Sequence, residues 1–480
     1  MGDHRQTRTT VEAAMKGAAA VHWDGPLRDP ASRLALLRAA ANELEASATD
    51  LIETANAETR LGEDRLRGEL TRTTTQLGAF AAIVADGSWA GATIELGPPD
   101  LRRMMWPIGP VVVFGASNFP FAFSTPGGDT ASALAAGCPV VVKAHPAHPR
   151  TAAIAATAID RAVSAVGLPT ATFQQLTGGV EVGTCLVEHP DTSAAGFTGS
   201  LAGGRALYDA ASRRPIPIPV FAEMSSINPV FVLPGALAER GDAVARELAD
   251  SVVLGVGQFC TNPGVVVVVD DSGFAELLAA ELANRPAAAM LTPGIAASYC
   301  GAVQRLIDTV GVDVLTGAPE EGQAACVLVG ADRFLDDPDL RAEVFGPLTM
   351  VVACEDPSQL LRVAARFEGQ LTSTVYGSGR DRDVAAGLLG ILPMHAGRLI
   401  WDGVPTGVAV SPAMHHGGPY PASTDGRSTS VGTAAIVRFL RPVAYQGVPD
   451  ELLPAELQNA NPLGIERRVN GTSTTDPIVR

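Results

Sequence analysis

The chain has 480 residues, of which 46% are apolar and 18% charged, and its 35 basic and 51 acidic side chains give a formal net charge of −16. This composition predicts a large folded protein of two or three domains, and an acidic balance without a basic cluster argues against sequence-independent nucleic-acid binding. No apolar run approaches the roughly 20 residues that span a bilayer. Residues 1–20 also lack the apolar region of a secretory signal. We therefore expect a cytoplasmic protein with neither membrane nor nucleic-acid partners.

Helical periodicity dominates the chain up to about residue 90. Apolar positions recur at helical spacing over 30–46, and the pattern continues over 50–59. The segment 92–105 predicts a hairpin around a Gly-Pro-Pro turn. From residue 108, short β-branched runs alternate with alanine-rich helices. The expected strands are 111–114, 140–142, 194–197 and 230–233, and the expected helices between them are 126–136, 151–166 and 201–212.

A second series of helices and strands begins near Gly235. We expect helices over 236–256, 274–284 and 296–310, and strands over 265–270, 326–329, 348–354 and 373–376. This alternation predicts an α/β protein with a parallel, doubly wound sheet, whose ligands lie at the carboxyl ends of strands. From Ser411 the chain becomes rich in Gly, Pro and Ser, with one strand-like piece at 434–440. This tail is either a flexible end or an arm that packs on a partner subunit.

One of the six cysteines stands in an unusual setting. Cys260 lies in Gly-Gln-Phe-Cys-Thr-Asn-Pro-Gly (257–264), a loop between an expected helix and an expected strand. A thiol in such a loop can be a nucleophile, and the alternative is a small buried hydrophobe. Without CxxC or Cys/His ligand spacing, we expect neither a disulfide framework nor a metal site. The other cysteines fit the buried alternative, in or beside strands (Cys138, Cys326, Cys354) or in helical segments (Cys185, Cys300).

Two further residues have side chains suited to catalysis. Glu223, in Phe-Ala-Glu-Met-Ser-Ser-Ile-Asn-Pro (221–229), is an acid in an apolar stretch. It is either a general base with a raised pKa or an exposed loop carboxylate. Asn118 follows the strand 111–114, where its amide could stabilise an oxyanion or cap a turn.

Several residues at expected strand ends could bind a nucleotide. Lys143 ends the strand 140–142, and it is one of only two lysines beside 33 arginines (35 − 2), which suggests a site for a compact point charge. Gly199-Ser200 opens the helix 201–212 and could bind a pyrophosphate. Glu343, in Glu-Val-Phe-Gly-Pro (343–347), could hold ribose hydroxyls. Because there is no GxGxxG or Walker A pattern, any dinucleotide would bind in a non-standard way.

The adjacent His415 and His416 are a weak candidate for a metal pair, because neighbours in an extended chain face opposite sides. Hydrolytic mechanisms find little support either. A GxSxG elbow is absent, and no histidine partner motif for a cysteine hydrolase is visible.

Six motifs, in this order, resemble those of the aldehyde dehydrogenase superfamily. They are GPVVVFGASNFPF (109–121), VVKAHPAHP (141–149), FTGS (197–200), FAEMSSINP (221–229), GQFCTNPG (257–264) and EVFGP (343–347). Within the superfamily, SSINP, KAHP and the tail 413–446 are similar to the α-ketoglutaric semialdehyde (2,5-dioxopentanoate) dehydrogenases, with NADP-dependent fatty aldehyde dehydrogenases as close relatives.

The resemblance implies an aldehyde dehydrogenase fold with three parts. A Rossmann-like nucleotide-binding domain would comprise 1–87 and 107–223, and an α/β catalytic domain 224–410. A β oligomerisation arm with the C-terminal tail would comprise 88–106 and 411–480, giving a homodimer or homotetramer.

The resemblance also implies roles for individual residues. Cys260 would attack the aldehyde, the Asn118 amide and the Cys260 backbone N–H would hold the oxyanion, and Glu223 would activate water. In the cofactor site, Lys143 would bind the adenine-side ribose or its 2′-phosphate. The remaining implied cofactor residues are Gly199 and Ser200 at the pyrophosphate, Glu343 at the nicotinamide ribose, and Phe345.

The implied reaction is NAD(P)-dependent oxidation of an aldehyde to an acid through a cysteine thiohemiacetal and a thioester. The favoured substrate is 2,5-dioxopentanoate, giving 2-oxoglutarate, and a broad-specificity aliphatic or aromatic aldehyde dehydrogenase is the alternative. Pro146 stands where NAD-preferring relatives often carry an acid, whereas Glu181 would repel a 2′-phosphate. We therefore expect use of both coenzymes with a slight preference for NADP. A binding protein that retains this fold is the alternative of a different class.

Overall fold

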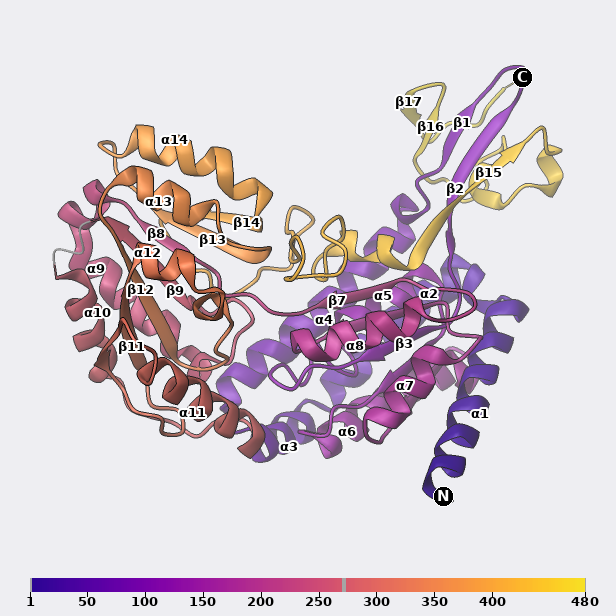
Figure 1. Ribbon diagram of the computed structural model, residues 1–480. Coiled ribbons are helices and arrows are strands. Elements are labelled where there is room, and N and C mark those ends of the chain that lie inside the picture. Colours follow the sequence, from indigo (N-terminus) through magenta and orange to yellow (C-terminus); the bar gives the residue numbers. More distant parts are fainter. Residues whose placement is uncertain (1, 270–272, 480) are drawn as a thin grey trace.

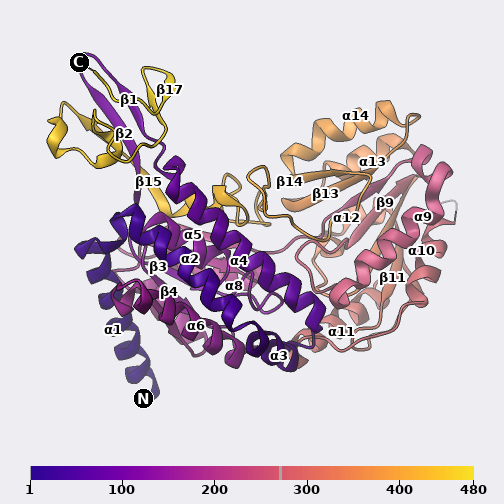
Figure 2. The same cartoon turned by 180° about the vertical axis from the view of Figure 1, so that it is seen from behind.

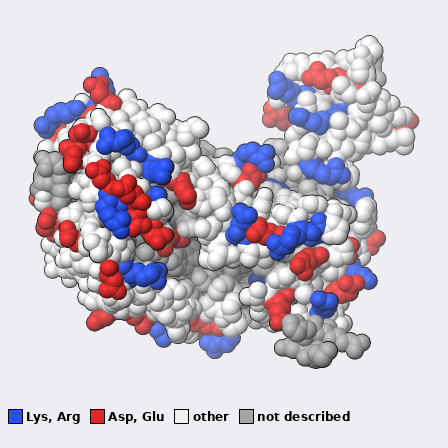
Figure 3. Space-filling view, viewed as in Figure 1, with Lys and Arg blue, Asp and Glu red and all other residues white. Residues whose placement is uncertain are grey.

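The computed structural model describes residues 2–269 and 273–479, which form two α/β lobes and a projecting β arm (Figure 1). Within these residues, no helix combines the length and the apolar character needed to cross a membrane. Acidic and basic side chains are interspersed on the face seen in Figure 3. The net negative charge therefore does not gather into one patch on that face.

The first lobe is built on a five-stranded parallel sheet in the order β5-β4-β3-β6-β7. Its strands are β3 (Val111–Phe114), β4 (Val140–Lys143), β5 (Phe173–Leu176), β6 (Ala194–Thr198) and β7 (Val220–Glu223). Its helices are α1 (Gly2–Asp24), α2 (Pro30–Ala46), α3 (Ala48–Thr59), α4 (Glu63–Ala85), α5 (Gly128–Ala136), α6 (Pro149–Ala165), α7 (Val180–Glu188) and α8 (Leu201–Ser212).

Side-chain alternation along the strands explains how this sheet is covered on both faces. Val111 and Val113 face one apolar cluster, which also contains residues of α2, α4, α5 and α6. Val112 and Phe114 face the other, which contains residues of α1, α7 and α8. Figure 2 shows α2, α4 and α6 over the first face. Strands that are buried on both faces have continuous β-branched sequences. The strands 111–114 and 140–142 could therefore be predicted from the sequence.

The second lobe holds a seven-stranded sheet in the order β10-β11-β12-β9-β8-β13-β14, in which only the β10–β11 pair is antiparallel. Its strands are β8 (Val230–Val232), β9 (Val265–Val269), β10 (Val312–Thr316), β11 (Ala325–Gly330), β12 (Leu348–Cys354), β13 (Gln370–Tyr376) and β14 (Ala396–Trp401). Its helices are α9 (Pro234–Val253), α10 (Phe274–Ala283), α11 (Pro293–Ile307), α12 (Ala331–Asp336), α13 (Pro357–Ala364) and α14 (Arg382–Ile391).

The arm is a separate five-stranded sheet in the order β15-β2-β1-β16-β17. It combines the hairpin of β1 (Thr93–Glu95) and β2 (Leu101–Pro107) with β15 (Leu440–Gln446), β16 (Arg467–Val469) and β17 (Thr472–Thr474) from the tail. Figure 1 shows it projecting away from both lobes, with the C-terminus at its end. The tail is thus paired with a strand hairpin more than 300 residues earlier (440 − 107 = 333).

Most predicted elements are confirmed, and α2 and α8 agree with the predicted bounds to the residue. The prediction of a strand at 434–440 is wrong, because Thr433–Phe439 forms a 3₁₀ helix and β15 begins only at Leu440. The last residue of the expected strand 265–270 lies outside the described residues. Sequence reasoning missed β5 and β7, whose short runs lack the repeated valines of their neighbours.

Candidate active site

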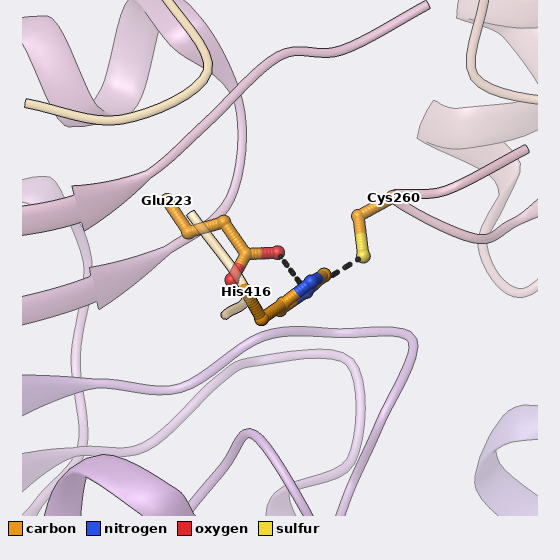
Figure 4. Close-up of side chains that lie close together, drawn as sticks. All are labelled: Glu223, Cys260 and His416. Carbon is orange, nitrogen blue, oxygen red and sulfur yellow. Dashed lines mark hydrogen bonds and ion pairs between the residues drawn. The ribbon is translucent and has the colours of Figure 1, made fainter. Parts of the chain in front are cut away.

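Three side chains from distant parts of the chain meet between the two lobes (Figure 4). Cys260 lies in a turn before β9, Glu223 is the last residue of β7, and His416 lies in the segment after β14. The His416 Nε2 atom is 3.5 Å from the Cys260 Sγ and 2.9 Å from the Glu223 Oε1. Glu223 and His416 are 4% and 1% exposed, so a buried imidazole and a buried carboxylate lie beside a partly exposed thiol.

The same histidine nitrogen contacts both partners, which constrains how protons can move. In a relay of the Ser-His-Asp kind, the nucleophile and the carboxylate sit on different ring nitrogens. Here both contacts converge on Nε2 of His416, so the imidazole and Glu223 together form one acceptor region beside the thiol. The arrangement can receive a proton from Cys260 without passing it across the ring.

Charge and burial tune the two ionisable partners in opposite directions. Burial would raise the pKa of Glu223, but the charge and hydrogen bonds supplied by His416 and Ser430 outweigh it and lower that pKa. The Ser430 hydroxyl donates to the Glu223 Oε2 at 2.7 Å. Burial, followed by the negative charge of Glu223, raises the pKa of the Cys260 thiol well above its ordinary value. The resting site is therefore a protonated thiol next to an ionised carboxylate, a pair of groups that can serve as nucleophile and base.

Asn228 holds the cysteine loop in place from the connection between β7 and β8. Its Nδ2 donates to the backbone carbonyls of Cys260 at 2.8 Å and Asn262 at 2.9 Å. Its Oδ1 accepts from the hydroxyls of Ser226 and Thr372. Asn228 is fully buried and adopts a φ of 48°, a left-handed conformation that asparagine tolerates better than most residues.

The structure brings Asn118 to the same loop. Its Nδ2 donates to the backbone carbonyl of Gln258, two residues before Cys260, at 3.0 Å. A carboxamide nitrogen carries two hydrogens, so one such bond leaves a donor for another acceptor. Asn118, Cys260 and Glu223 all line one cleft of about 610 Å³.

This cleft also contains most of the predicted cofactor residues. Gly199 and Ser200 line it from the start of α8, and Glu343 and Phe345 line it from the segment before β12 in the opposite lobe. The Ser200 hydroxyl caps α8 by accepting from the Gly203 N–H. Helix N-termini favour anions, so this wall fits a pyrophosphate.

Glu343 and Lys143 differ in their placement. Glu343 is contacted by the Ser225 side chain and the Ser226 N–H, yet burial raises its pKa to about 7. Lys143 ends β4 and is half-buried, and burial lowers its pKa. Lys143 is not among the residues that line the cleft, whereas His145, two residues further along the chain, is.

Sequence reasoning missed one participant, His416. In the sequence it stands out only beside His415, as a weak metal pair. No local motif marks it as a cysteine partner, because it contacts Cys260 from 156 residues along the chain. For Glu223, the exposed-carboxylate alternative is wrong because the side chain is buried, and the expected raised pKa is wrong because its contacts lower that pKa. The ligand atoms of Glu223, Cys260 and His416 lie within 4.8 Å of one another, close enough for a metal, but their mutual contacts already pair them as an acid–base group.

Comparison with known proteins now identifies the family. The model of the aldehyde dehydrogenase family matches residues 3–428. The chain belongs to the aldehyde dehydrogenase family. It is therefore an oxidoreductase of aldehydes, in a family that uses NAD or NADP, and the resemblance drawn from the six motifs is confirmed.

Curated relatives of this family member cover nearly the whole chain. An α-ketoglutaric semialdehyde dehydrogenase 2 from Azospirillum brasilense is 50% identical over 459 residues, covering 92% of this chain and 87% of the relative. An α-ketoglutaric semialdehyde dehydrogenase from Acinetobacter baylyi is 46% identical over 449 residues, covering 90% and 85%.

Solved structures show the fold alone. A γ-glutamyl-γ-aminobutyraldehyde dehydrogenase from Burkholderia cenocepacia superposes with a TM-score of 0.77 at 20% identity, covering 91% of this chain and 88% of that one. A 1-pyrroline-5-carboxylate dehydrogenase superposes with a TM-score of 0.78 at 21% identity, covering 92% and 86%. The expected aldehyde dehydrogenase fold is thereby confirmed.

Proposed function

We propose that this aldehyde dehydrogenase oxidises 2,5-dioxopentanoate (α-ketoglutaric semialdehyde) to 2-oxoglutarate. The observation that carries the substrate assignment is 50% identity to an α-ketoglutaric semialdehyde dehydrogenase along 92% of the chain. The contact of Cys260 with His416, and of His416 with Glu223, supplies the nucleophile and base that the reaction needs.

In the proposed mechanism, Cys260 is the nucleophile. Its proton passes to the adjoining Glu223–His416 acceptor, since the raised pKa of the thiol requires a base within reach. The thiolate then adds to the aldehyde carbon. The Asn118 amide and the Cys260 N–H donate to the oxygen as it becomes negative, which lowers the energy of this tetrahedral species.

The second half of the reaction releases the acid. When bound, the nicotinamide coenzyme supplies the hydride acceptor. Glu223 takes a proton from water as the water attacks the thioester carbon, and the C–S bond then breaks to release the acid and return the Cys260 thiolate. The Ser430 hydroxyl, 2.7 Å from Oε2, orients the carboxylate for this step. The oxyanion donors serve both tetrahedral species, so one preorganised loop assists both halves.

We further propose how the coenzyme lies in the cleft. Gly199 and Ser200 would hold the pyrophosphate at the start of α8, and Lys143 the adenine-side ribose or its 2′-phosphate. Glu343 would hold the nicotinamide ribose, with Phe345 beside it. A proline at position 146 leaves no carboxylate there to repel a 2′-phosphate, which supports use of both coenzymes with a slight preference for NADP.

The domain roles complete the proposal. Residues 1–87 and 107–223 would bind the coenzyme, and residues 224–410 would carry the catalytic cysteine. Residues 88–106 and 411–480 would join subunits into a homodimer or homotetramer, which is supported by the projection of the arm sheet away from both lobes.

Steady-state and burst kinetics test the function. With NADP and with NAD, we expect a higher kcat/KM for 2,5-dioxopentanoate than for pentanal. Cys260→Ala should abolish turnover, whereas Cys185→Ala, which removes a helical cysteine distant from the site in sequence, should retain it. Glu223→Ala should keep a burst of one reduced coenzyme per site and lose steady turnover. Turnover that survives in Cys260→Ala would refute the mechanism. A higher kcat/KM of the wild-type enzyme for pentanal would refute the substrate assignment.

A further inference from the structure

Helix α4 presents two arginines to the aromatic residues around the nucleophile. Arg65 and Arg72 are seven residues apart (72 − 65), or about two turns, and so share one face of the helix. The Arg65 guanidinium lies 4.9 Å from the ring centroid of Phe119 and 4.7 Å from that of Phe259. Phe119 follows Asn118 and Phe259 precedes Cys260, so this helix face borders the oxyanion donors.

Arg72 lies next to the catalytic trio itself. Its guanidinium is 5.0 Å from the ring centroid of Phe123, and that ring is 6.0 Å from the imidazole of His416. Burial lowers the pKa of Arg72. The negative charge of Glu69 opposes that lowering most, followed by the Cys260 thiolate when it forms and by Glu223. Neither Arg65 nor Arg72 lines the 610 Å³ cleft assigned to the coenzyme, so they approach the thiol from another side.

The hydrogen-bonding capacity of both guanidinium groups is largely unused. Arg72 has both terminal nitrogens, Nη1 and Nη2, buried without a partner, and only its Nε donates, to the Val408 carbonyl at 3.4 Å. Arg65 donates from Nη2 to the Asn118 carbonyl at 2.7 Å, while its Nε and Nη1 are buried without a partner. Buried donors without acceptors are costly, and a guanidinium fork matches the two oxygens of a carboxylate.

Neighbouring charged residues neither pair with the unused nitrogens of the two arginines nor offer an equivalent carboxylate site. Glu69 lies on α4 between the two arginines, but its Oε1 accepts from the N–H groups of Phe121 and Ala122, and its Oε2 has no hydrogen-bond partner. Arg398, whose charge also acts on Cys260, uses both terminal nitrogens to hold the carbonyls of Gly407 and Pro405. Arg72 therefore has two terminal guanidinium nitrogens without a hydrogen-bond partner near the thiol, and Arg65 lies on the same face of the helix.

We infer that Arg72, assisted by Arg65, binds the carboxylate of an acidic aldehyde whose carbonyl carbon sits at Cys260. The inference rests on the proposed function and specifies how its substrate is selected. Four carbon–carbon bonds separate the carboxylate from the aldehyde carbon of 2,5-dioxopentanoate, which in an extended chain is about 5 Å. Phe123, which contacts Arg72 on one side and lies near His416 on the other, would flank the intervening carbons. A neutral aldehyde of equal length would leave the two arginines unpaired.

The test compares 2,5-dioxopentanoate with pentanal, a five-carbon aldehyde without the carboxylate. We expect Arg72→Met to lower the ratio of their kcat/KM values by roughly 30-fold, the effect of losing one charge-assisted pair. The loss should appear mainly in KM for the acid. Arg72→Lys should recover part of it, because a point charge replaces the fork. Arg67→Met, an exposed arginine on the same helix, is the matched control and should leave the ratio unchanged.

A second measurement tests carboxylate binding by Arg72 without turnover. Glutarate, a five-carbon dicarboxylate that cannot react, should slow alkylation of Cys260 by iodoacetamide in wild type and in Arg67→Met, but not in Arg72→Met. Mass spectrometry of the Cys260 peptide reports this, and thermal melting confirms that each variant is folded. An unchanged substrate ratio together with equal glutarate protection in Arg72→Met would overturn the inference. A wild-type enzyme that turns over neither aldehyde would refute the proposed function instead. In that case, the glutarate protection experiment would still show whether Arg72 binds a carboxylate.

Discussion

At the scale of single residues, burial and local contacts set the ionisation of this protein more than its net charge does. Glu223 and Glu69 are both buried, yet they ionise differently. Contacts with His416 and Ser430 lower the pKa of Glu223, whereas burial raises the pKa of Glu69 to about 7 despite two backbone hydrogen bonds and two nearby arginines. Removal of water favours the neutral form of a carboxyl group, and the pKa falls only where the contacts of that group outweigh this effect.

Glu69 makes the stability of the protein depend on pH. Since its pKa is about 7 when folded and 4.5 ordinarily, the folded state binds more protons than the unfolded state between these values. The contribution of Glu69 to stability is therefore complete below pH 4.5 and is lost as pH rises through 7. We expect the free energy of unfolding of wild type, relative to Glu69→Gln, to fall by about 3 kcal/mol over this range.

Urea unfolding at pH 5 and pH 8, at one protein concentration, measures this difference. Glu69→Gln retains an oxygen to accept from Phe121 and Ala122, so those contacts are kept. The control is Glu45→Gln at an exposed position of α2, for which we expect no comparable trend. A difference between wild type and Glu69→Gln that stays constant with pH would contradict the prediction.

At the scale of elements, the position of the nucleophile depends on the connection between β7 and β8. Asn228 donates to the carbonyls of Cys260 and Asn262 from a fully buried position. Asn228→Asp keeps the shape but removes both donors and sets an acid against two carbonyl oxygens. We expect a loss of about 3 kcal/mol in stability, as for a buried polar group left unpaired, together with a lower kcat.

Chemical denaturation and steady-state kinetics measure the two effects of Asn228→Asp. Asn42→Asp, on the exposed face of α2, makes the same chemical change at the surface and should alter neither. If Asn228→Asp left kcat intact while lowering stability, the cysteine loop would be held by other contacts.

The elements differ in how far the sequence determines them. Strands such as β3 and β4 could be predicted because both of their faces are buried and every position is apolar or nearly so. Strand β7 could not, because it follows a proline-rich stretch, although it ends in Glu223. Cys260, Glu223 and Asn118 could be placed by their motifs. His416, Arg65 and Arg72 acquire their surroundings only when α4 and the segment after β14 pack against the cysteine loop, and no local pattern records that packing.

At the scale of the whole molecule, the arm is a sheet separate from those of the two lobes. It joins strands from residues 93–107 and 440–474 into one sheet, with β15 and β17 at its edges. Unpaired strand edges readily pair with another chain. This supports the proposed assembly through the arm.

We therefore expect two or four 49.4-kDa chains per particle in sedimentation analysis. The melting temperature should rise with protein concentration, because association stabilises only the folded chain. A particle of one chain, with a melting temperature independent of concentration, would contradict this prediction.

The wide separation of Glu223, Cys260 and His416 along the chain also has a consequence during biosynthesis. Glu223 and Cys260 are translated early enough for their lobes to begin folding, but His416 and Ser430 emerge more than 150 residues after the thiol (416 − 260 = 156). Until then Glu223 lacks both of the side chains that contact it in the finished site. A nascent chain on the ribosome thus contains the nucleophile long before it contains the means to use it, and catalytic competence arises in a single late event.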